Sequence, residues 1–169
     1  MEFEYTYCPK CSGKLETRLV EGRERQVCSQ CGFIFYRNPI PAAAVILKND
    51  DGVLLVQRAI EPRAGDWCLP AGFMEWNEGP EQTAIREVKE ETNLDIKLRG
   101  IYGVYPGSDY PAYKIVLIVY WGEILGGELR PGDDAKDTKF FKLAELPENI
   151  AFRIHSNILN ALKNEGEGR

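Results

Sequence analysis

The chain has 169 residues, of which 44% are apolar, and its formal net charge at pH 7 is -5. This length and apolar content suffice for one ordinary domain and a small appendage. The acidic balance argues against a protein that binds nucleic acid mainly through the phosphate backbone, which requires a basic face. The longest apolar run, IVLIVYW at 115–121, is shorter than the ~20 residues of a membrane span, so we expect no contact with a membrane.

Four of the five cysteines lie in two C-x-x-C pairs near the N-terminus. CPKC (Cys8 and Cys11) and CSQC (Cys28 and Cys31) are separated by sixteen residues, which is typical of a zinc ribbon. Four sulfurs complete a tetrahedron around Zn²⁺, so we interpret the zinc as structural and predict a zinc ribbon over 1–36. The N-terminal MEFEYTYCPK lacks the pattern of a secretion signal, so we expect a cytoplasmic location, where metal binding is favoured over disulfides.

A second domain is predicted over 37–169. It begins with the proline-containing linker RNPIP at 37–41. Two apolar runs around the turn signal NDDG then predict a hairpin within 42–58. The segment EPRAGDWCLPAGF at 61–73 is expected to be a loop, in which we interpret Trp67 and Cys68 as core residues.

The remaining elements follow from turn signals and apolar periodicity. A helix is predicted over 80–92, because Pro80 suits the first turn of a helix and Asn93 suits its end. We expect strands at 96–105, 113–124 and 138–143, a last helix at 152–163 and a frayed end at 164–169. Such an order is not a regular βαβ alternation, so it predicts a mixed sheet with helices packed on it.

The predicted helix carries three crowded carboxylates, Glu87, Glu90 and Glu91. At about 100° per residue they lie beside the apolar stripe that contains Val88, whereas Lys89 points away from them. A solvated acidic face is one interpretation, because like charges at this spacing cost little in water. A site for a hard divalent cation is the other, because Mg²⁺ and Mn²⁺ are held by a few carboxylates together with substrate phosphates.

Residues 72–94 resemble the Nudix box, G-x5-E-x7-R-E-U-x-E-E-x-G-U, in which U is aliphatic. The matching residues are Gly72, Glu78, Arg86, Glu87, Val88, Glu90, Glu91 and Leu94. Asn93 stands where the family has glycine, at a position that usually needs a left-handed backbone, which asparagine adopts more readily than most residues. The resemblance implies an α/β protein: a Nudix α/β/α sandwich with a mixed β-sheet, preceded by the small zinc ribbon.

The similarity extends over about 8–160, because a zinc ribbon, an N-P-x-P linker and a Nudix box resemble two groups of pyrophosphatases. One group acts on NADH and carries an S-Q-P-W-P-F-P motif, where this chain has YGVYPGSDYPAYKI. The other group, of the plant plastid type, acts on FAD or ADP-ribose. The resemblance therefore implies a divalent-metal-dependent pyrophosphatase that cuts FAD-like or ADP-ribose-like dinucleotides. An NADH or NAD-cap pyrophosphatase and a non-catalytic ligand-binding regulator remain alternatives.

By this resemblance, Mg²⁺ or Mn²⁺ would be held by Glu87, Glu90, Glu91 and the carbonyl of Gly72. Arg86 and Glu78 would orient the cluster. The general base is left open between Glu87 and a later acidic residue, either Asp137 or its competitors Asp133 and Asp134. The catalytic residues implied are Glu87, Glu91, Asp137 and Arg86.

Substrate contacts are expected from aromatic rings and arginines, because a base or flavin favours an aromatic face and a diphosphate favours cations. Tyr105, Tyr110 and Tyr113 are the aromatic candidates in the main domain, and Phe35 or Tyr36 could reach in from the ribbon. Arg58 and Arg63 are candidates for phosphate contacts. His155, the only histidine, is interpreted as a structural residue. The expected partner is a small-molecule nucleotide rather than nucleic acid, and a homodimer is possible because many relatives dimerise.

Overall fold

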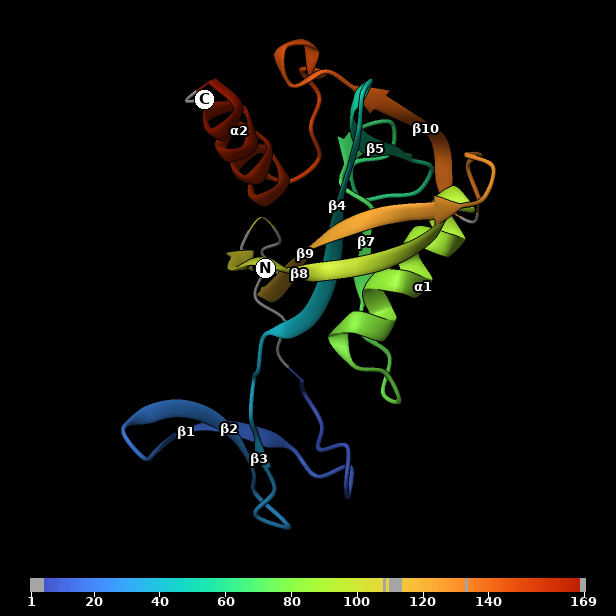
Figure 1. Ribbon diagram of the computed structural model, residues 1–169. Coiled ribbons are helices and arrows are strands. Elements are labelled where there is room, and N and C mark those ends of the chain that lie inside the picture. The colour runs from blue at the N-terminus through green and yellow to red at the C-terminus, as the bar shows by residue number, and fades with distance from the viewer. Residues whose placement is uncertain (1–4, 108, 110–113, 133, 168–169) are drawn as a thin grey trace.

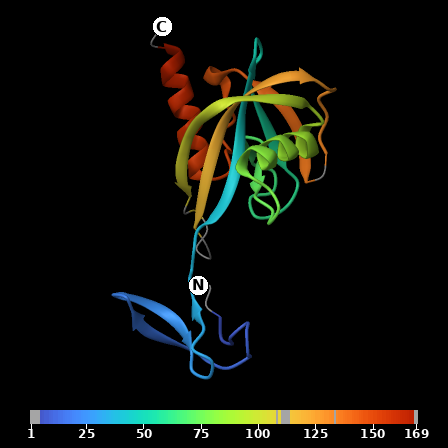
Figure 2. The ribbon, with the colours of Figure 1, turned by 60° about the horizontal axis from the view of Figure 1, so that its bottom comes forward.

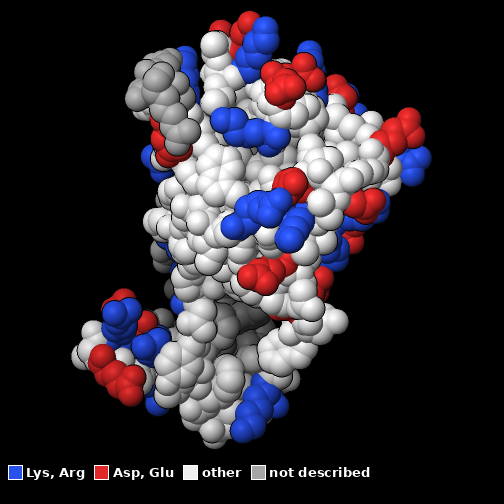
Figure 3. All heavy atoms as spheres, in the orientation of Figure 1, with Lys and Arg blue, Asp and Glu red and all other residues white. Residues whose placement is uncertain are grey.

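The structure is a computed structural model that describes residues 5–107, 109, 114–132 and 134–167. Figure 1 shows a small sheet formed by the N-terminal residues and a larger sheet with two helices, joined by the extended segment that leads into β4. No helix in the described residues is long and apolar enough to cross a membrane. Acidic and basic side chains are intermingled on the face shown in Figure 3.

The small sheet has the order β1-β2-β3 and is antiparallel. Its strands are β1 (Leu15–Val20), β2 (Arg23–Cys28) and β3 (Ile34–Phe35). Among its described residues, Cys8, Leu15 and Cys28 form a buried apolar cluster against which Phe33 packs. Because so small an apolar core contributes little folding energy, we expect the ribbon to depend on bound metal for its stability.

The large sheet is mixed and has the order β10-β5-β4-β9-β8, with β6 paired to β5 and β7 paired to β4. Only β4 and β9 run parallel among the named strand pairs of its described residues. The strands are β4 (Ile40–Asn49), β5 (Gly52–Arg58), β6 (Trp67–Cys68), β7 (Ala71–Phe73), β8 (Asp95–Gly107), β9 (Ile115–Gly126) and β10 (Ala135–Phe141). The helices are α1 (Pro80–Thr92), the 3-10 helix η1 (Leu143–Glu145) and α2 (Arg153–Glu167).

Strand β4 is buried on both faces, and its alternate residues belong to two separate cores. Ala43, Val45 and Leu47 pack with Ala84 and Val88 of α1. On the other face, Ala42, Ala44 and Ile46 pack with apolar residues of α2, namely Ile154, Ile158, Leu159 and Leu162. Figures 1 and 2 show the two helices on opposite sides of the sheet. The predicted α/β/α sandwich with a mixed sheet is confirmed.

The predicted helix over 80–92 is confirmed, with the same ends. At its start the backbone N–H of Gly79 donates to the Gln82 side chain at 2.8 Å, and Pro80 occupies the first turn. At its end Asn93 has φ 60°, in the left-handed region, and its side chain donates to the carbonyl of Glu128 at 2.9 Å. Asparagine therefore takes the conformation that glycine supplies in the family pattern.

Three expectations about the elements are wrong in detail. The expected loop at 61–73 contains β6 and β7, because Trp67 and Cys68 pair with β5 while 71–73 pair with β4. Within the expected linker, β4 already begins at Ile40, and Pro41 near its start leaves the strand intact. Helix α2 continues to Glu167, so the expected frayed end is helical as far as it is described.

Candidate active site

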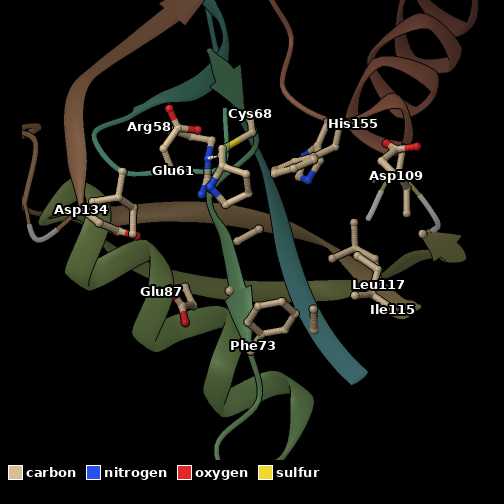
Figure 4. A pocket seen from close by; sticks show the side chains of 18 of the residues that line it. Arg58, Glu61, Cys68, Phe73, Glu87, Asp109, Ile115, Leu117, Asp134 and His155 are labelled. Atoms are coloured by element: carbon tan, nitrogen blue, oxygen red, sulfur yellow. Dashed lines mark hydrogen bonds between the residues drawn. The ribbon is translucent and has the colours of Figure 1, made fainter. Parts of the chain in front are cut away.

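A cavity of about 490 Å³ lies where β5, β6, β7, β9, α1 and the start of α2 meet. In Figure 4 the carboxylates of Glu87 and Asp134 lie at one side of this cavity, and Ile115 and Leu117 lie at the other. The guanidinium of Arg58 projects into the space between them. The cavity thus combines an acidic end, where cations would collect, with an apolar end that suits the less polar part of a ligand.

The crowded carboxylates of α1 are neutralised in part by one side chain, Arg86. Its guanidinium donates to both oxygens of Glu78, at 2.6 and 3.0 Å, and to Glu87 at 2.7 Å and Glu90 at 2.8 Å. It also donates to the carbonyl of Phe73 at 3.1 Å. The hydrogen bonds from Arg86 hold the pKa of Glu78 at about 2, so this carboxyl group stays ionised. Arg86 therefore fixes the direction in which Glu87 points.

Glu91 differs from its neighbours because it is buried, with only 5% of its surface exposed. Its Oε2 accepts a hydrogen bond from the backbone N–H of Ala71 at 3.0 Å, and no ion pair joins it to a Lys or Arg among the described residues. Burial raises the pKa of Glu91, and the nearby charge of Glu87 raises it further. Burial likewise raises the pKa of Glu87. A buried carboxylate such as Glu91, which has no cationic partner among the described residues, is suited to a cation ligand role.

Gly72 lies directly against Glu87. A Cβ at position 72 would lie 1.9 Å from Oε1 of Glu87, so only glycine leaves room for this carboxylate beside β7. Gly72, Glu87 and Asp134 line the cavity together. The carboxylates of Glu87 and Asp134 and the carbonyl of Gly72 are hard oxygen donors of the kind that Mg²⁺ and Mn²⁺ prefer, so their chemistry fits such an ion. Glu91 is buried and does not line the cavity, so its role as a ligand stays a prediction.

We expect Gly72→Ala to lower kcat by about a hundredfold, because the new methyl group displaces Glu87 from its position. Steady-state kinetics and a thermal melt would check this. Ala71→Gly, one residue earlier in the same strand, is the matched control for altered backbone freedom. If kcat were unchanged in Gly72→Ala, catalysis would not depend on the position of Glu87 beside Gly72.

The sulfur atoms of Cys8, Cys11, Cys28 and Cys31 all lie within 4.8 Å of one another, and these cysteines are not joined by disulfides. The backbone N–H of Cys31 donates to the sulfur of Cys28 and lowers the pKa of that thiol to about 6. A thiolate at this position is ready to bind metal. The predicted four-sulfur cluster is thus assembled, and the donor set fits zinc.

Two family matches together cover residues 6–162. Residues 38–162 match the NUDIX domain, and residues 6–37 match the zinc ribbon domain described as Nudix N-terminal. The chain belongs to the Nudix hydrolase family. Members of this family use divalent metals, which agrees with the oxygen donors at the acidic end of the cavity.

This Nudix hydrolase is 41% identical over 118 residues to an ADP-ribose pyrophosphatase of Methanocaldococcus jannaschii, covering 69% of each chain. It is 29% identical over 143 residues to the NAD-capped RNA hydrolase NudC of Vibrio atlanticus, covering 84% of this chain and about half, 51%, of that protein. A crystal structure of a NUDIX hydrolase from Nitrosomonas europaea superposes with a TM-score of 0.83 at 34% identity, covering 98% of this chain and 94% of the other.

Glu87 lines the cavity, and of the later acidic residues proposed as base Asp134 lines it but Asp137 does not. Asp137 is exposed on β10, where its carboxylate accepts a hydrogen bond from the N–H of Thr138 at 2.8 Å. Asp133 lies outside the described residues. Glu90 has 41% of its side chain exposed and is held by Arg86, and it does not line the cavity, so its role as a ligand stays a prediction.

Among the predicted substrate contacts, only Arg58 lines the cavity within the described residues. Tyr105 instead packs against the core on the α2 side and stacks with Tyr102 at 6.4 Å between ring centroids. Tyr110 and Tyr113 lie outside the described residues. The remaining candidates, Arg63, Tyr36 and Phe35, do not line the cavity. The guanidinium of Arg63 forms an ion pair with Asp66 at 2.7 Å. The ring of Tyr36 lies with its centre 4.5 Å from the guanidinium carbon of Arg25, and the ring centres of Phe35 and Tyr5 are 4.8 Å apart.

Cys68, which was expected in the core, and His155, which was expected to be a structural residue, are both buried, and both also line the cavity. Phe152, which was expected only as part of the last helix, lines it as well. The helix was predicted to begin at Phe152, whereas α2 begins at Arg153, so Phe152 stands directly before the helix, where Ser, Thr, Asp or Asn is usual.

We expect Cys28→Ser to abolish zinc binding and to unfold the ribbon, because this segment has so small a core. Metal analysis should find one zinc per wild-type chain and none in the variant, and limited proteolysis should cut only the ribbon of the variant. Ser29→Ala, at the neighbouring exposed position, is the control. A protease-resistant ribbon in zinc-free protein would contradict the structural role of the metal.

Proposed function

We propose that this Nudix hydrolase is a Mg²⁺- or Mn²⁺-dependent pyrophosphatase of FAD-like or ADP-ribose-like dinucleotides. Its products would be AMP and a phosphorylated moiety, FMN or ribose 5-phosphate. The observation that carries the proposal is the carboxylate of Glu87 at the acidic end of a cavity of about 490 Å³, together with the neighbouring buried carboxylate of Glu91. A cavity of this size suits a nucleotide-sized ligand. The 41% identity to an ADP-ribose pyrophosphatase supports the substrate class.

The proposed chemistry explains the acidic helix face. A diphosphate repels an attacking hydroxide, and bound divalent cations neutralise that charge and lower the pKa of water. Glu87, Glu91 and the Gly72 carbonyl would hold the cations. Water attacks one phosphorus atom, the bridging P–O bond breaks, and the proton of the water passes to Glu87 or Asp134. Arg86 would position Glu87 rather than contact the substrate, because its Nη1 donates a hydrogen bond to Oε1 of Glu87 at 2.7 Å.

Asp134 is our preferred candidate for a base outside the box, because it lines the cavity and Asp137 does not. Asp134→Asn should lower kcat by about 10²-fold or more, whereas Asp137→Asn should change it by less than about threefold. Kinetics at several pH values would compare the two variants. A larger loss in Asp137→Asn would restore the residue favoured from the sequence.

A panel of substrates tests the proposed function. FAD, ADP-ribose, NADH, an NAD-capped oligonucleotide, Ap4A and 8-oxo-dGTP should be assayed with Mg²⁺ and with Mn²⁺. We expect the highest kcat/KM for FAD or ADP-ribose. Activity on the nucleoside triphosphate alone would refute the proposal.

The second candidate function is an NADH or NAD-cap pyrophosphatase. It is favoured by the 29% identity to NudC of Vibrio atlanticus over 84% of this chain. A clear preference for NADH or the NAD-capped oligonucleotide over FAD would establish it in place of the first.

Three further proposals concern the protein as a whole. We propose that the boundary between the two domains lies after residue 36. We propose a cytoplasmic location, because four free thiols that would bind metal suit a reducing compartment. We also propose that the protein forms a homodimer. Limited proteolysis, cell fractionation and light scattering respectively test these proposals.

A further inference from the structure

His155 is buried but uses only one of its two ring nitrogens within the described structure. It has 4% of its surface exposed, and its Nδ1 accepts a hydrogen bond from the backbone N–H of Leu69 at 3.2 Å. A neutral imidazole whose Nδ1 is an acceptor carries its proton on Nε2. No described residue accepts a hydrogen bond from Nε2. Because the ring lines the cavity, this donor is available to a ligand.

The charge state of His155 limits the kind of ligand atom it would bind. Burial, and to a lesser degree the charge of Arg58, lower the pKa of His155 to about 4, so the ring is uncharged at neutral pH. An uncharged N–H donor suits an uncharged acceptor such as a ring nitrogen or a carbonyl oxygen. Phosphate groups are better matched by the cation of Arg58, which lines the same cavity.

Phe152 lies one helical turn before His155 and has an unusual backbone. Its φ is 63°, in the left-handed region that non-glycine residues rarely occupy. Its carbonyl accepts hydrogen bonds from the N–H groups of His155 and Ser156, so Phe152 stands at the N-cap of α2. Such a conformation is strained for a residue other than glycine and is often kept where it serves a ligand site.

A residue from a different segment supplies the cap that phenylalanine cannot provide. The carboxylate of Asp109 accepts a hydrogen bond from the N–H of Arg153, the first residue of α2. The side chain at position 152 is therefore not needed as a cap. It instead forms part of the cavity wall, with the Arg58 guanidinium 5.2 Å from the centre of its ring.

The two rings form a continuous surface beside the apolar end of the cavity. Their centroids are 6.0 Å apart with an interplanar angle of 47°. Figure 4 shows His155 and Asp109 on the side of the cavity where Ile115 and Leu117 lie, away from Glu87. A dinucleotide whose diphosphate lies at the carboxylates would extend its ring system toward this surface.

We propose that Phe152 and His155 recognise the heteroaromatic ring of the substrate, which lies against Phe152 and accepts a hydrogen bond from Nε2 of His155. Adenine offers ring nitrogens as acceptors, and a flavin offers carbonyl oxygens as well. This assignment rests on the proposed function, because it takes the ligand to be a nucleotide. In this assignment His155 determines substrate specificity, in addition to accepting the hydrogen bond from the backbone N–H of Leu69.

A matched pair of variants separates the two roles of His155. In His155→Asn the amide oxygen can accept from the N–H of Leu69, as Nδ1 does, but no donor reaches the position of Nε2. In His155→Gln the amide N–H₂ can reach that position. Ribose 5-diphosphate, which has a diphosphate but no base, serves as the reference substrate, and Phe152→Leu removes the aromatic face.

We expect His155→Asn and Phe152→Leu each to raise KM for FAD and ADP-ribose by about tenfold, with a smaller effect on kcat. The loss in kcat/KM should be several times larger for these substrates than for ribose 5-diphosphate. His155→Gln should recover most of the loss. Equal losses on the base-containing and base-free substrates, or no recovery in His155→Gln, would overturn the proposal.

Calorimetric titration of AMP and FMN into the same variants gives a test that does not depend on turnover. If the wild-type protein binds AMP or FMN but hydrolyses none of the dinucleotides, the proposed function is refuted. Ring recognition still holds in that case if His155→Asn binds the same nucleotide about tenfold more weakly than wild type. Wild-type protein that binds neither nucleotide, or variants that bind as tightly as wild type, would refute ring recognition.

Discussion

Replacing Glu91 with glutamine is expected to abolish turnover and, at the same time, to make the metal-free protein more stable. The substitution removes a charged oxygen from the predicted cation site, and losing several kcal/mol of charge stabilisation should lower kcat by about a thousandfold. The amide oxygen can still accept the hydrogen bond from Ala71, so the local fold is retained. Removing a buried charge should raise the free energy of unfolding by about 1 to 2 kcal/mol at neutral pH.

The stability gain should depend on pH in a defined direction. The pKa of Glu91 is raised in the folded protein, so the folded state binds more protons than the unfolded state as pH rises above the usual carboxyl value near 4.5. Wild-type stability therefore falls, through this group, as pH rises from that value through the folded pKa. Glutamine does not titrate, so the difference between the proteins should be largest at neutral pH and vanish near pH 4.

Urea denaturation of metal-free wild type and Glu91→Gln at several pH values would measure this difference. Glu81→Gln makes the same chemical change at an exposed position in the first turn of α1 and is the control. Excess Mg²⁺ should narrow or reverse the difference, because it binds the folded wild-type protein better. A variant that is active, or less stable than wild type without metal, would disprove the assignment of Glu91.

Replacing Arg86 with lysine is expected to lower both activity and stability, although the charge is kept. The guanidinium of Arg86 bonds at once to Glu78, Glu87 and Glu90, and an ammonium group cannot reproduce the paired bonds to Glu78. We expect a loss of about 2 kcal/mol in the free energy of unfolding, because the side chain of Arg86 is only 27% exposed. The loss in kcat should be about a hundredfold, because Glu87 is no longer held in position.

Denaturation curves and steady-state kinetics would measure both effects. Arg99→Lys, at an exposed ion pair with Glu123, is the matched control and should change neither quantity appreciably. If Arg86→Lys kept full activity, the position of Glu87 would have to depend on something other than this guanidinium.

The sequence predicted the elements whose physical signals are strong and local. Helix α1 was found with correct ends, because Pro80 and Asn93 mark its limits and its apolar residues follow the helical period. The four cysteines were brought together as expected, because the spacing of two C-x-x-C turns reflects the geometry of the metal. The short strands β6 and β7 were missed, because the glycines and prolines around them indicate a loop, and only pairing with β4 and β5 makes them strands.

The side chains that line the cavity were harder to predict, because irregular backbone decides where they point. A register shift between Ala135 and Asp137 interrupts the pairing of β10, so position in the sequence does not show which acid faces the carboxylates. Strand β8 has further register shifts before Tyr105, which break the period of two. The position of Phe152 depends on its own left-handed backbone at the start of α2, a conformation that its sequence does not indicate because phenylalanine rarely adopts it.

Titration of Mn²⁺ into the zinc-loaded protein, followed by calorimetry, tests the central claim that the carboxylates of α1 hold a divalent cation. Wild type should bind Mn²⁺, and Glu91→Gln should bind it at least about tenfold more weakly. Equal binding by the two proteins, or no binding to wild type with or without nucleotide, would contradict the claim.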